Sequence, residues 1–367
     1  MKGKPEIAVI GLKGLPAFGG AAAVGENIMN ELKNNYSFTV YSTSSHTNLK
    51  TGEYNGIRQI VFSKIPFKKL NSLFYYMFSA LHAITRIRKY DLIHLHHRDA
   101  AFIIKILRLR NYKIITTLHG MRLTEKWQKY QGFFSKQDKY LLNKHNTITS
   151  VSSIIYSDII NSSGKEVIYI PNGISQQLNT SEEKTISEPY ILFAAGRVLP
   201  SKGCHLLLKA AIKINFIEKI VIAGDIDQMI DYKSEILTLT QALNVELKGL
   251  IKEKKLLFNL LRNAQLFIYP SNTEAMSMML LEAAAAKVPV ICADIPENKI
   301  VFNDNEVVYF KSDDVDDLAE KMLYAISHEE QMKSMAERAY FRLIKEYSWS
   351  KIASQYDQLY QSLLKQQ

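Results

Sequence analysis

The sequence predicts an α/β protein with two doubly wound domains, and three observations lead to this prediction. The chain has 367 residues, which is more than one ordinary hydrophobic core accommodates. Short β-branched apolar runs alternate with helical patterns, which is typical of parallel sheets covered by helices on both faces. The pattern resets across residues 179–190, a polar and charged stretch that we interpret as a linker.

The boundaries of these elements follow from the same pattern. We expect an N-terminal domain at 1–178, a second domain at 187–340 and a closing helix within 341–367, where apolar residues recur at helical spacing. In doubly wound sheets, ligands bind at the carboxyl ends of strands, so functional residues should directly follow the predicted strands. These strands are residues 6–12, 38–43, 57–63, 91–97, 113–119, 147–152, 167–173, 190–196, 219–225, 245–249, 266–271, 288–294 and 307–310.

The composition is that of a soluble globular protein, with 47% hydrophobic and 22% charged residues. No apolar run is long enough to span a membrane, and the short apolar run near the N-terminus fits a first strand better than a secretory signal. The two cysteines, Cys204 and Cys292, lie far apart and lack metal-ligand spacing. We therefore expect a cytoplasmic protein without disulfides or a zinc site.

The net charge of +10 is distributed unevenly along the chain. Residues 1–170 hold 24 Lys and Arg against 10 Asp and Glu, whereas the remainder is mildly acidic. This asymmetry suggests that the first half faces something anionic: a membrane surface, a phosphorylated acceptor or nucleic acid.

A glycine-rich loop, "GLKGLPAFGG", follows the first predicted strand and precedes a helix. Gly19 and Gly20 would let the backbone approach a ligand, and the amides of a helix N-terminus favour a phosphate. The loop has neither the spacing of a dinucleotide fingerprint nor the Lys and Ser or Thr of a phosphate-binding P-loop. By itself it is a weak signal.

Histidines follow two neighbouring strands of the first domain. His119 comes directly after one strand, and His94, His96 and His97 lie at the end of the one before it. Histidines in such numbers suggest a metal, but no carboxylate or cysteine stands at ligand spacing, so we expect no metal here. A lone histidine is more often structural, although its place at a strand end favours the ligand-binding crevice for His119.

Cations and carboxylates follow the strands of the second domain. Arg197 ends one strand, and Lys202 precedes the next helix, so the two cations predict a diphosphate site. In "SNTEAMSMMLLEAAAAK", Glu274 precedes a helix that starts near Ser277, and Glu282 lies inside it. Carboxylates in an apolar segment are costly unless they are exposed, paired or bound to a ligand. Hydroxyls of two sugars, one beyond each end of a diphosphate on the helix amides, would explain both glutamates.

With these motifs in order, the chain resembles the retaining glycosyltransferases of family 4, which have the GT-B fold. The resemblance spans nearly the whole chain through "GLPAFGG", "TLHG", "IPNGI", "AAGRVLPSKG", "VIAGD" and "YPSNTEAMSMMLLEA". The first loop further resembles a bacterial rhamnosyltransferase-like subgroup. The resemblance implies two Rossmann-like doubly wound domains facing across a cleft, with the C-terminal helix closing back.

The resemblance also implies a role for each candidate residue. The residues that would bind the donor's diphosphate are Arg197, Lys202, Gly19 and Gly20, with the amides of Ser277, Met278 and Met279 on its oxygens. Glu274 would contact the hydroxyls of the donor sugar, and His119 would lie beside that sugar. Glu282 would contact the ribose of the nucleotide. Two stretches, "EAMS" and "HGMRLTEKW", depart from the family's usual sequence, which puts the acceptor in doubt.

By the same resemblance, the reaction is a metal-independent transfer with retention, in which cations and a helix dipole stabilise the leaving phosphate. An apparent Asp-x-Asp, Asp314 and Asp316, could suggest a metal-dependent enzyme, but it opens a helical pattern, where Asp is a common cap. We expect the capping role.

We expect the enzyme to build a cell-surface polysaccharide, with a nucleotide-sugar as donor and a lipid-linked saccharide as acceptor. The alternatives are a sugar phosphorylase or non-hydrolysing sugar-nucleotide epimerase of the same architecture, and a non-catalytic subunit that binds a nucleotide-sugar. Turnover without an acceptor would indicate the epimerase, and loss of diphosphate ligands would indicate the subunit. No motif supports nucleic-acid binding.

Residues 64–90 have basic ends and an apolar, aromatic middle. Two interpretations stay open. The segment is a helix packed on the sheet with exposed basic ends, or it lies on the inner face of an anionic membrane, with contact through Phe67, Lys68 and Lys69.

Overall fold

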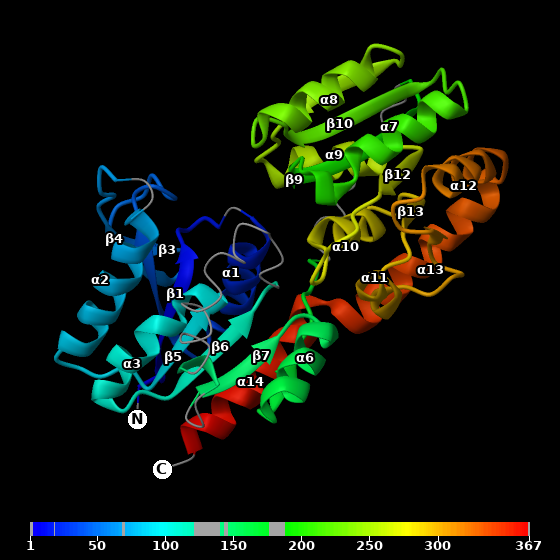
Figure 1. Ribbon diagram of the computed structural model, residues 1–367. Coiled ribbons are helices and arrows are strands. Elements are labelled where there is room, and N and C mark those ends of the chain that lie inside the picture. The colour runs from blue at the N-terminus through cyan, green and yellow to red at the C-terminus, as the bar shows by residue number, and fades with distance from the viewer. Residues whose placement is uncertain are drawn as a thin grey trace. The chain divides into compact units, whose positions relative to one another are not determined.

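The computed structural model in Figure 1 describes residues 3–17, 19–67, 70–120, 140–142, 146–175 and 188–365. The chain forms two compact units, residues 1–173 with 349–367, and residues 174–348. Each unit is an α/β layer structure around one sheet, as predicted. Most of the predicted linker, 179–190, lies outside the described residues.

The sheet of the first unit has the strand order β3-β4-β2-β1-β5-β6-β7-β8. All neighbours are parallel except β3 and β4. The predicted strands are confirmed, whereas β3 was missed because its three residues, "GEY", lack the β-branched pattern. The strands are β1 (Glu6–Lys13), β2 (Ser37–Thr43), β3 (Gly52–Tyr54), β4 (Ile57–Phe62), β5 (Leu92–His96), β6 (Ile114–Leu118), β7 (Asn146–Ser150) and β8 (Val167–Tyr169).

Helices pack on this sheet through their apolar faces. Buried residues recur along each helix at helical spacing, and the residues between them are more exposed. Helix α6 shows how local sequence sets the ends: the Ser152 side chain accepts from two first-turn amides, and Gly164 ends the helix with φ 65°. The helices are α1 (Gly20–Leu32), α2 (Asn71–Thr85), α3 (Ile104–Leu107), α6 (Ser153–Ser163) and α14 (Trp349–Lys365).

The sheet of the second unit is entirely parallel and has the order β11-β10-β9-β12-β13-β14. Its strands are β9 (Tyr190–Arg197), β10 (Lys219–Asp225), β11 (Val245–Gly249), β12 (Leu266–Tyr269), β13 (Val290–Ala293) and β14 (Val308–Phe310). Its helices are α7 (Cys204–Lys213), α8 (Ile230–Thr240), α9 (Lys254–Asn263), α10 (Met278–Ala285), α11 (Pro296–Val301), α12 (Val315–Ser327) and α13 (Glu329–Tyr347).

Each sheet reverses its winding direction between two neighbouring central strands. In the first unit the chain proceeds outward from β1 on one side and from β5 on the other, and in the second unit from β9 and from β12. At such a point the loops leave the two strands in opposite directions and open a crevice at their carboxyl ends. The topology therefore places the glycine loop and His97 at one switch point, and Arg197 and Glu274 at the other.

The C-terminal segment differs from the single closing helix expected within 341–367. Helix α13 runs to Tyr347 in the second unit, and Ser348 adopts an extended conformation (φ −64°, ψ 142°) that ends it. Helix α14 then packs on the first unit, where Tyr360 is fully buried. The indole of Trp349 lies so close to Gly173 that a Cβ there would come within 2.7 Å of it. The apolar spacing predicted the buried face of α14, but it did not predict the break between the two helices at Ser348.

No helix in the described ranges combines the length and the apolar character that crossing a bilayer requires.

The turn before α7 is fixed by one glycine. Gly203 has φ +72°, and an added Cβ would lie 2.1 Å from the Pro270 carbonyl oxygen. We predict that Gly203→Ala destabilises the second unit by about 3 kcal/mol or more, because both the backbone conformation and the contact forbid a side chain. Urea unfolding of the purified variant measures this.

Gly196→Ala is the matched control, since a Cβ at Gly196 meets nothing within 4 Å. It should shift stability by no more than about 0.5 kcal/mol. Equal unfolding midpoints for the two variants would contradict the role given to Gly203.

Candidate functional site

Two loops of the second unit are docked on each other at the switch point. The Ser201 carbonyl accepts from the Asn272 amide (3.1 Å) and from the Ser271 hydroxyl (3.1 Å). Gly203 permits the close approach to Pro270 described above. These contacts hold the turn after β9 against the exit of β12, and so they fix Lys202 beside Glu274.

Glu274 lies at the centre of a short polar network. Its Oε1 accepts from Lys202 Nζ at 2.5 Å and from the Tyr269 hydroxyl at 2.6 Å. The side chains of Lys202 and Glu274 are 24% and 10% exposed, so the pair is partly shielded but reachable from solvent. Burial and the nearby carboxylate raise the pKa of Tyr269 well above its usual value, which keeps its hydroxyl protonated as a donor. The network holds one carboxylate in a defined orientation.

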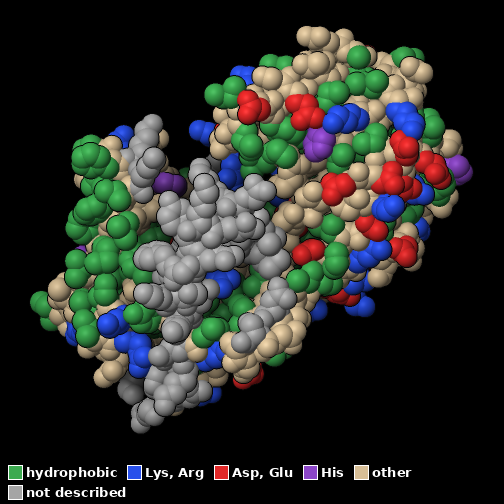
Figure 2. All heavy atoms as spheres, viewed as in Figure 1, with side chains coloured by type: hydrophobic (Ala, Val, Ile, Leu, Met, Phe, Trp, Pro, Cys, Tyr) green, Lys and Arg blue, Asp and Glu red, His purple; other side chains and the backbone are tan. Residues whose placement is uncertain are grey.

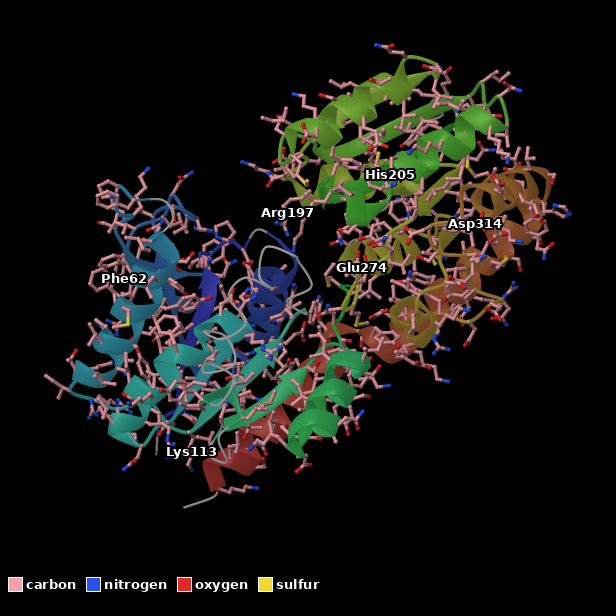
Figure 3. The ribbon with its side chains drawn as sticks, in the orientation of Figure 1. Phe62, Lys113, Arg197, His205, Glu274 and Asp314 are labelled. Carbon is pink, nitrogen blue, oxygen red and sulfur yellow. The ribbon has the colours of Figure 1, made fainter. Side chains whose placement is uncertain are left out.

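Arg197 is the last residue of β9, in register with Asp225 of the neighbouring strand. Its side chain is exposed and makes no hydrogen bond or ion pair with the part of the chain that the structure describes. Figure 3 places Arg197 and Glu274 at the same edge of the second unit. A guanidinium at a strand end without a protein partner can take a phosphate in a bidentate manner.

The N-terminus of α10 lies between the two glutamates in the sequence. The Ser277 side chain caps the helix by accepting from the Leu280 amide at 3.2 Å. Helix geometry gives the amides of the first turn no intrahelical partner, so those of Met278 and Met279 remain for an anion.

Glu282 lies one turn into α10 and is half-buried. Burial raises the pKa of its carboxyl to about 7, while Lys254 at the start of α9 acts in the opposite direction. A carboxyl that titrates near neutral pH is poorly solvated in the free protein. Hydrogen bonds from a ligand's hydroxyls would favour its charged form.

Glu297 is a carboxylate that the sequence reasoning missed. It lies in the first turn of α11, after the next strand of the sheet. Burial raises its pKa, and the charge of Glu274 adds to this, which places the two carboxylates within electrostatic reach. The sequence did hold a signal for Glu297: Pro296 and Glu297 follow closely after the predicted strand 288–294. Pro is common in the first turn of a helix, so a helix beginning at the carboxyl end of this strand could have been expected.

The Asp-x-Asp stretch caps a helix, as predicted. The Asp314 side chain accepts from the amides of Asp316 and Asp317 at the N-terminus of α12, and Asp316 pairs with Lys213. Within the described ranges, no group of three or more His, Cys, Asp or Glu side chains is arranged to hold a metal ion.

In the first unit, the glycine loop ends at the N-terminus of α1. Gly19 has φ 100°, which favours glycine, and a Cβ there would meet no atom within 4 Å. Gly20 is the first residue of α1, and no side chain caps this end. The amides of the first turn of α1 therefore have no side-chain cap among the described residues.

His119 lies just after β6 and joins a histidine cluster. Its Nε2 is 2.9 Å from His96 Nδ1, with the two rings stacked, and the His97 ring lies 5.4 Å away. His94 is bonded to Tyr360 and Thr117 deeper in the unit. Burial and its histidine neighbours hold the pKa of His119 well below its usual value. His119 is therefore a neutral hydrogen-bonding group, with Nε2 engaged by His96.

The predicted site residues thus fall into two sets. The second unit brings together Lys202 and Glu274 in direct contact, with Arg197 on the adjacent strand. Gly19, Gly20 and His119 belong to the first unit, at the ends of β1 and β6. Part of "HGMRLTEKW", the stretch expected to bear on acceptor choice, lies outside the described residues.

Two family models match the chain. Residues 18–178 match the model described as Glycosyltransferase Family 4, and residues 176–342 match the model described as Glycosyl transferases group 1. The chain is 24% identical to the uncharacterized glycosyltransferase MJ1178 of Methanocaldococcus jannaschii, over 95% of this chain and 96% of that protein. It is 27% identical to the putative teichuronic acid biosynthesis glycosyltransferase TuaC of Bacillus subtilis, over 63% of this chain and 60% of that protein.

Solved structures agree on the fold. The structure of HepE from Anabaena in complex with UDP-glucose superposes with a TM-score of 0.79 at 16% identity, covering 97% of this chain and 99% of that one. At this identity the likeness concerns the fold, which in both chains consists of two Rossmann-like units.

The raised pKa of Glu282 predicts that the native protein loses stability as pH rises. The folded state holds this proton more tightly than the unfolded chain, where Glu titrates near 4, so the contribution of Glu282 to stability is lost as pH rises through about 7. We predict that the free energy of unfolding of Glu282→Gln, relative to that of the native protein, rises by about 1–3 kcal/mol from pH 5 to pH 8. Urea unfolding at several pH values measures the gap.

Glu320→Gln is the matched control, because Glu320 is an exposed carboxylate on α12 of the same unit and the change removes one charge without affecting a shielded group. A gap between Glu282→Gln and the native protein that does not change with pH would contradict the prediction.

Proposed function

The chain is a GT-B glycosyltransferase, and we propose that it moves a sugar from a nucleotide-diphospho-sugar to a hydroxyl of a lipid-linked saccharide, with retention of configuration. The observation that carries this proposal is the Lys202–Glu274–Tyr269 network at the switch point of the second sheet. A carboxylate held by a cation and a phenol beside a helix N-terminus suits a ligand that has hydroxyls next to phosphates.

The donor's phosphates and sugars fit different parts of this site. The cations Arg197 and Lys202 and the amides of α10 suit a diphosphate, and Glu274 and Glu282 suit sugar hydroxyls on either side of it. Solved structures of the same fold hold UDP or UDP-glucose, which supports a nucleotide-sugar donor.

The chemical step follows from the same charges. As the bond to the donor sugar breaks, negative charge grows on the leaving diphosphate, and cations and helix amides already in place stabilise it without reorganisation. The proposal includes no metal, because these groups supply the positive charge that a metal would otherwise provide. The acceptor hydroxyl attacks from the face that the diphosphate leaves, and the departing phosphate takes its proton.

The first unit offers groups of its own for a donor. Gly19 leaves room beside the N-terminus of α1 for a phosphate, and Gly20 is the first residue of that helix. His119, neutral through burial, would hydrogen-bond the sugar without placing a charge beside the developing oxocarbenium ion.

The acceptor is proposed from relatives rather than from geometry. A similarity to a protein named for teichuronic acid biosynthesis supports cell-surface polysaccharide as the product. The rhamnosyltransferase-like subgroup, suggested by the first loop, supports a deoxyhexose or hexose as the transferred sugar. The enzyme would work at the inner face of the cell membrane.

A thermal-shift panel identifies the donor's nucleotide. We predict that one of UDP, GDP, TDP and ADP raises the melting temperature, since a ligand in hundredfold excess over its Kd adds about 2.7 kcal/mol of stability. No shift with any nucleotide in a folded sample would contradict the proposed site and favour a non-catalytic role.

Glu274→Ala tests the sugar contact. We predict that it lowers the transfer rate by about 10²–10³-fold, because the donor sugar loses its positioning carboxylate, while the nucleotide still raises the melting temperature. Radiolabelled sugar transfer to a membrane extract measures the rate.

Asp316→Asn is the matched control, an exposed carboxylate of the same unit. It should leave transfer unchanged. Native activity in Glu274→Ala would remove the role given to Glu274, and a loss in Asp316→Asn would indicate that the Asp-x-Asp stretch also serves the reaction.

A further inference from the structure

Helix α2 is apolar on both of its long faces. The inner face is buried against the sheet by Tyr75, Tyr76, Ser79, Ala80 and Ala83. It is also pinned by hydrogen bonds: the Tyr75 hydroxyl accepts from the Gly11 amide and donates to the Tyr41 carbonyl, at 2.8 and 2.9 Å. The helix is therefore held in place without help from its outer face.

The outer face presents a continuous apolar stripe to solvent. Its residues recur at spacings of three and four, and their exposed fractions lie between 38% and 46%. Figure 2 shows hydrophobic side chains gathered along α2. Large contiguous apolar patches are rare on monomeric proteins and mark interaction sites. We define the α2 stripe as Leu70, Leu73, Phe74, Phe78 and Leu81.

The stripe extends beyond the helix at its N-terminal side. Phe67 is 69% exposed, and a shallow groove runs between the exit of β4 and the helix, lined by Phe62, Ile65, Pro66, Phe78 and Leu81. Phe62, labelled in Figure 3, packs its ring 5.9 Å from that of Phe78. The exposed apolar surface thus spans a helix and the adjoining loop.

The charge around the stripe is mainly positive, although Glu6 pairs with Arg86 and Arg88 and the exposed Asp99 lies in the turn before α3. The sequence has no Asp or Glu anywhere in 54–90, which contains seven Lys and Arg, and none in 100–124. Lys64 is exposed at the groove, and Lys105 is exposed on α3, which packs beside α2. Leu109, 75% exposed, follows α3. A wide apolar strip with a net positive border is complementary to lipid chains beneath anionic headgroups.

We propose that the α2 stripe docks on the surface of a bilayer that contains anionic lipid, with its leucines and phenylalanines in the headgroup boundary and Lys64 and Lys105 against the lipid phosphates. The packed-helix interpretation of residues 64–90 holds for the inner face of α2, and membrane contact is what we propose for its outer face; Lys68 and Lys69, expected to take part in that contact, lie outside the described residues. The inference goes beyond the donor chemistry proposed above and does not depend on it.

Two other occupants fit less well. A second copy of the chain would bring two rims of net positive charge together, and like charges across an interface oppose association. Nucleic acid would meet the cations but would leave the leucines of the stripe without an apolar partner.

The test is sedimentation with vesicles of phosphatidylcholine alone or of an equal mixture with phosphatidylglycerol. The native protein should bind the mixed vesicles and bind less as salt is added. Leu73→Gln with Leu81→Gln should weaken this binding at least tenfold, because two leucines lose their burial in the bilayer.

The matched control is Leu237→Gln with Leu323→Gln, two exposed leucines on helices of the second unit. It should bind like the native protein. Equal binding by both double variants, or no binding of the native protein to mixed vesicles, would overturn the proposal. So would a dimer in solution that only the α2 variant abolishes.

Both double variants should retain the native melting temperature and its shift with nucleotide. That readout separates the outcomes, because a failure of membrane binding leaves the nucleotide shift intact, and a failure of the proposed donor site leaves vesicle binding intact.

Discussion

The reversal of winding between β9 and β12 is the constraint on which the rest of the second unit depends. Because the two strands are neighbours and their loops leave in opposite directions, the turn before α7 and the loop before α10 must share one edge of the sheet. Gly203 makes the approach of these loops sterically possible, and the Ser201 carbonyl bonds them together. The contact between Lys202 and Glu274 follows from this packing. The same reversal between β1 and β5 brings the glycine loop and the histidine cluster to one edge of the first sheet.

The charges at these edges are arranged before any ligand arrives. Glu274 is held by a cation and a phenol, Arg197 is exposed at a strand end, and desolvation raises the pKa of the half-buried Glu282 to about 7. A ligand that brings hydroxyls to the glutamates and phosphates to the cations satisfies all of them. Such preorganisation is the main means by which a protein stabilises charge that develops on a leaving group. The outer face of α2 belongs to the first unit, whereas Arg197, Glu274 and Glu282 belong to the second, so membrane docking and donor binding place their demands on different parts of the sequence.

Much of this was available from the sequence. Apolar runs of four to eight residues predicted the long strands, and residues that directly follow them, such as Arg197 and Glu274, were correctly placed at the carboxyl edge. The capping role of Asp314 was predicted from its position before a helical pattern. Three features could not be predicted. The strand β3 has three residues without a β pattern, the break at Ser348 depends on which unit each helix packs against, and the proximity of Glu297 to Glu274 depends on tertiary packing. The sequence also did not determine whether α2 packs on the sheet or contacts a membrane, since an apolar helix pattern does not show which face of the helix is covered.

We propose that fixed cations and helix amides, rather than a metal ion, hold the donor's diphosphate. Calorimetric titration of the nucleoside diphosphate into protein treated with EDTA tests it most directly. We expect the same Kd in EDTA and in added Mg²⁺. We expect a Kd at least tenfold weaker for Arg197→Ala with Lys202→Ala, because this double variant removes two charge-assisted contacts. Binding that requires Mg²⁺, or that the double variant leaves unchanged, would contradict it.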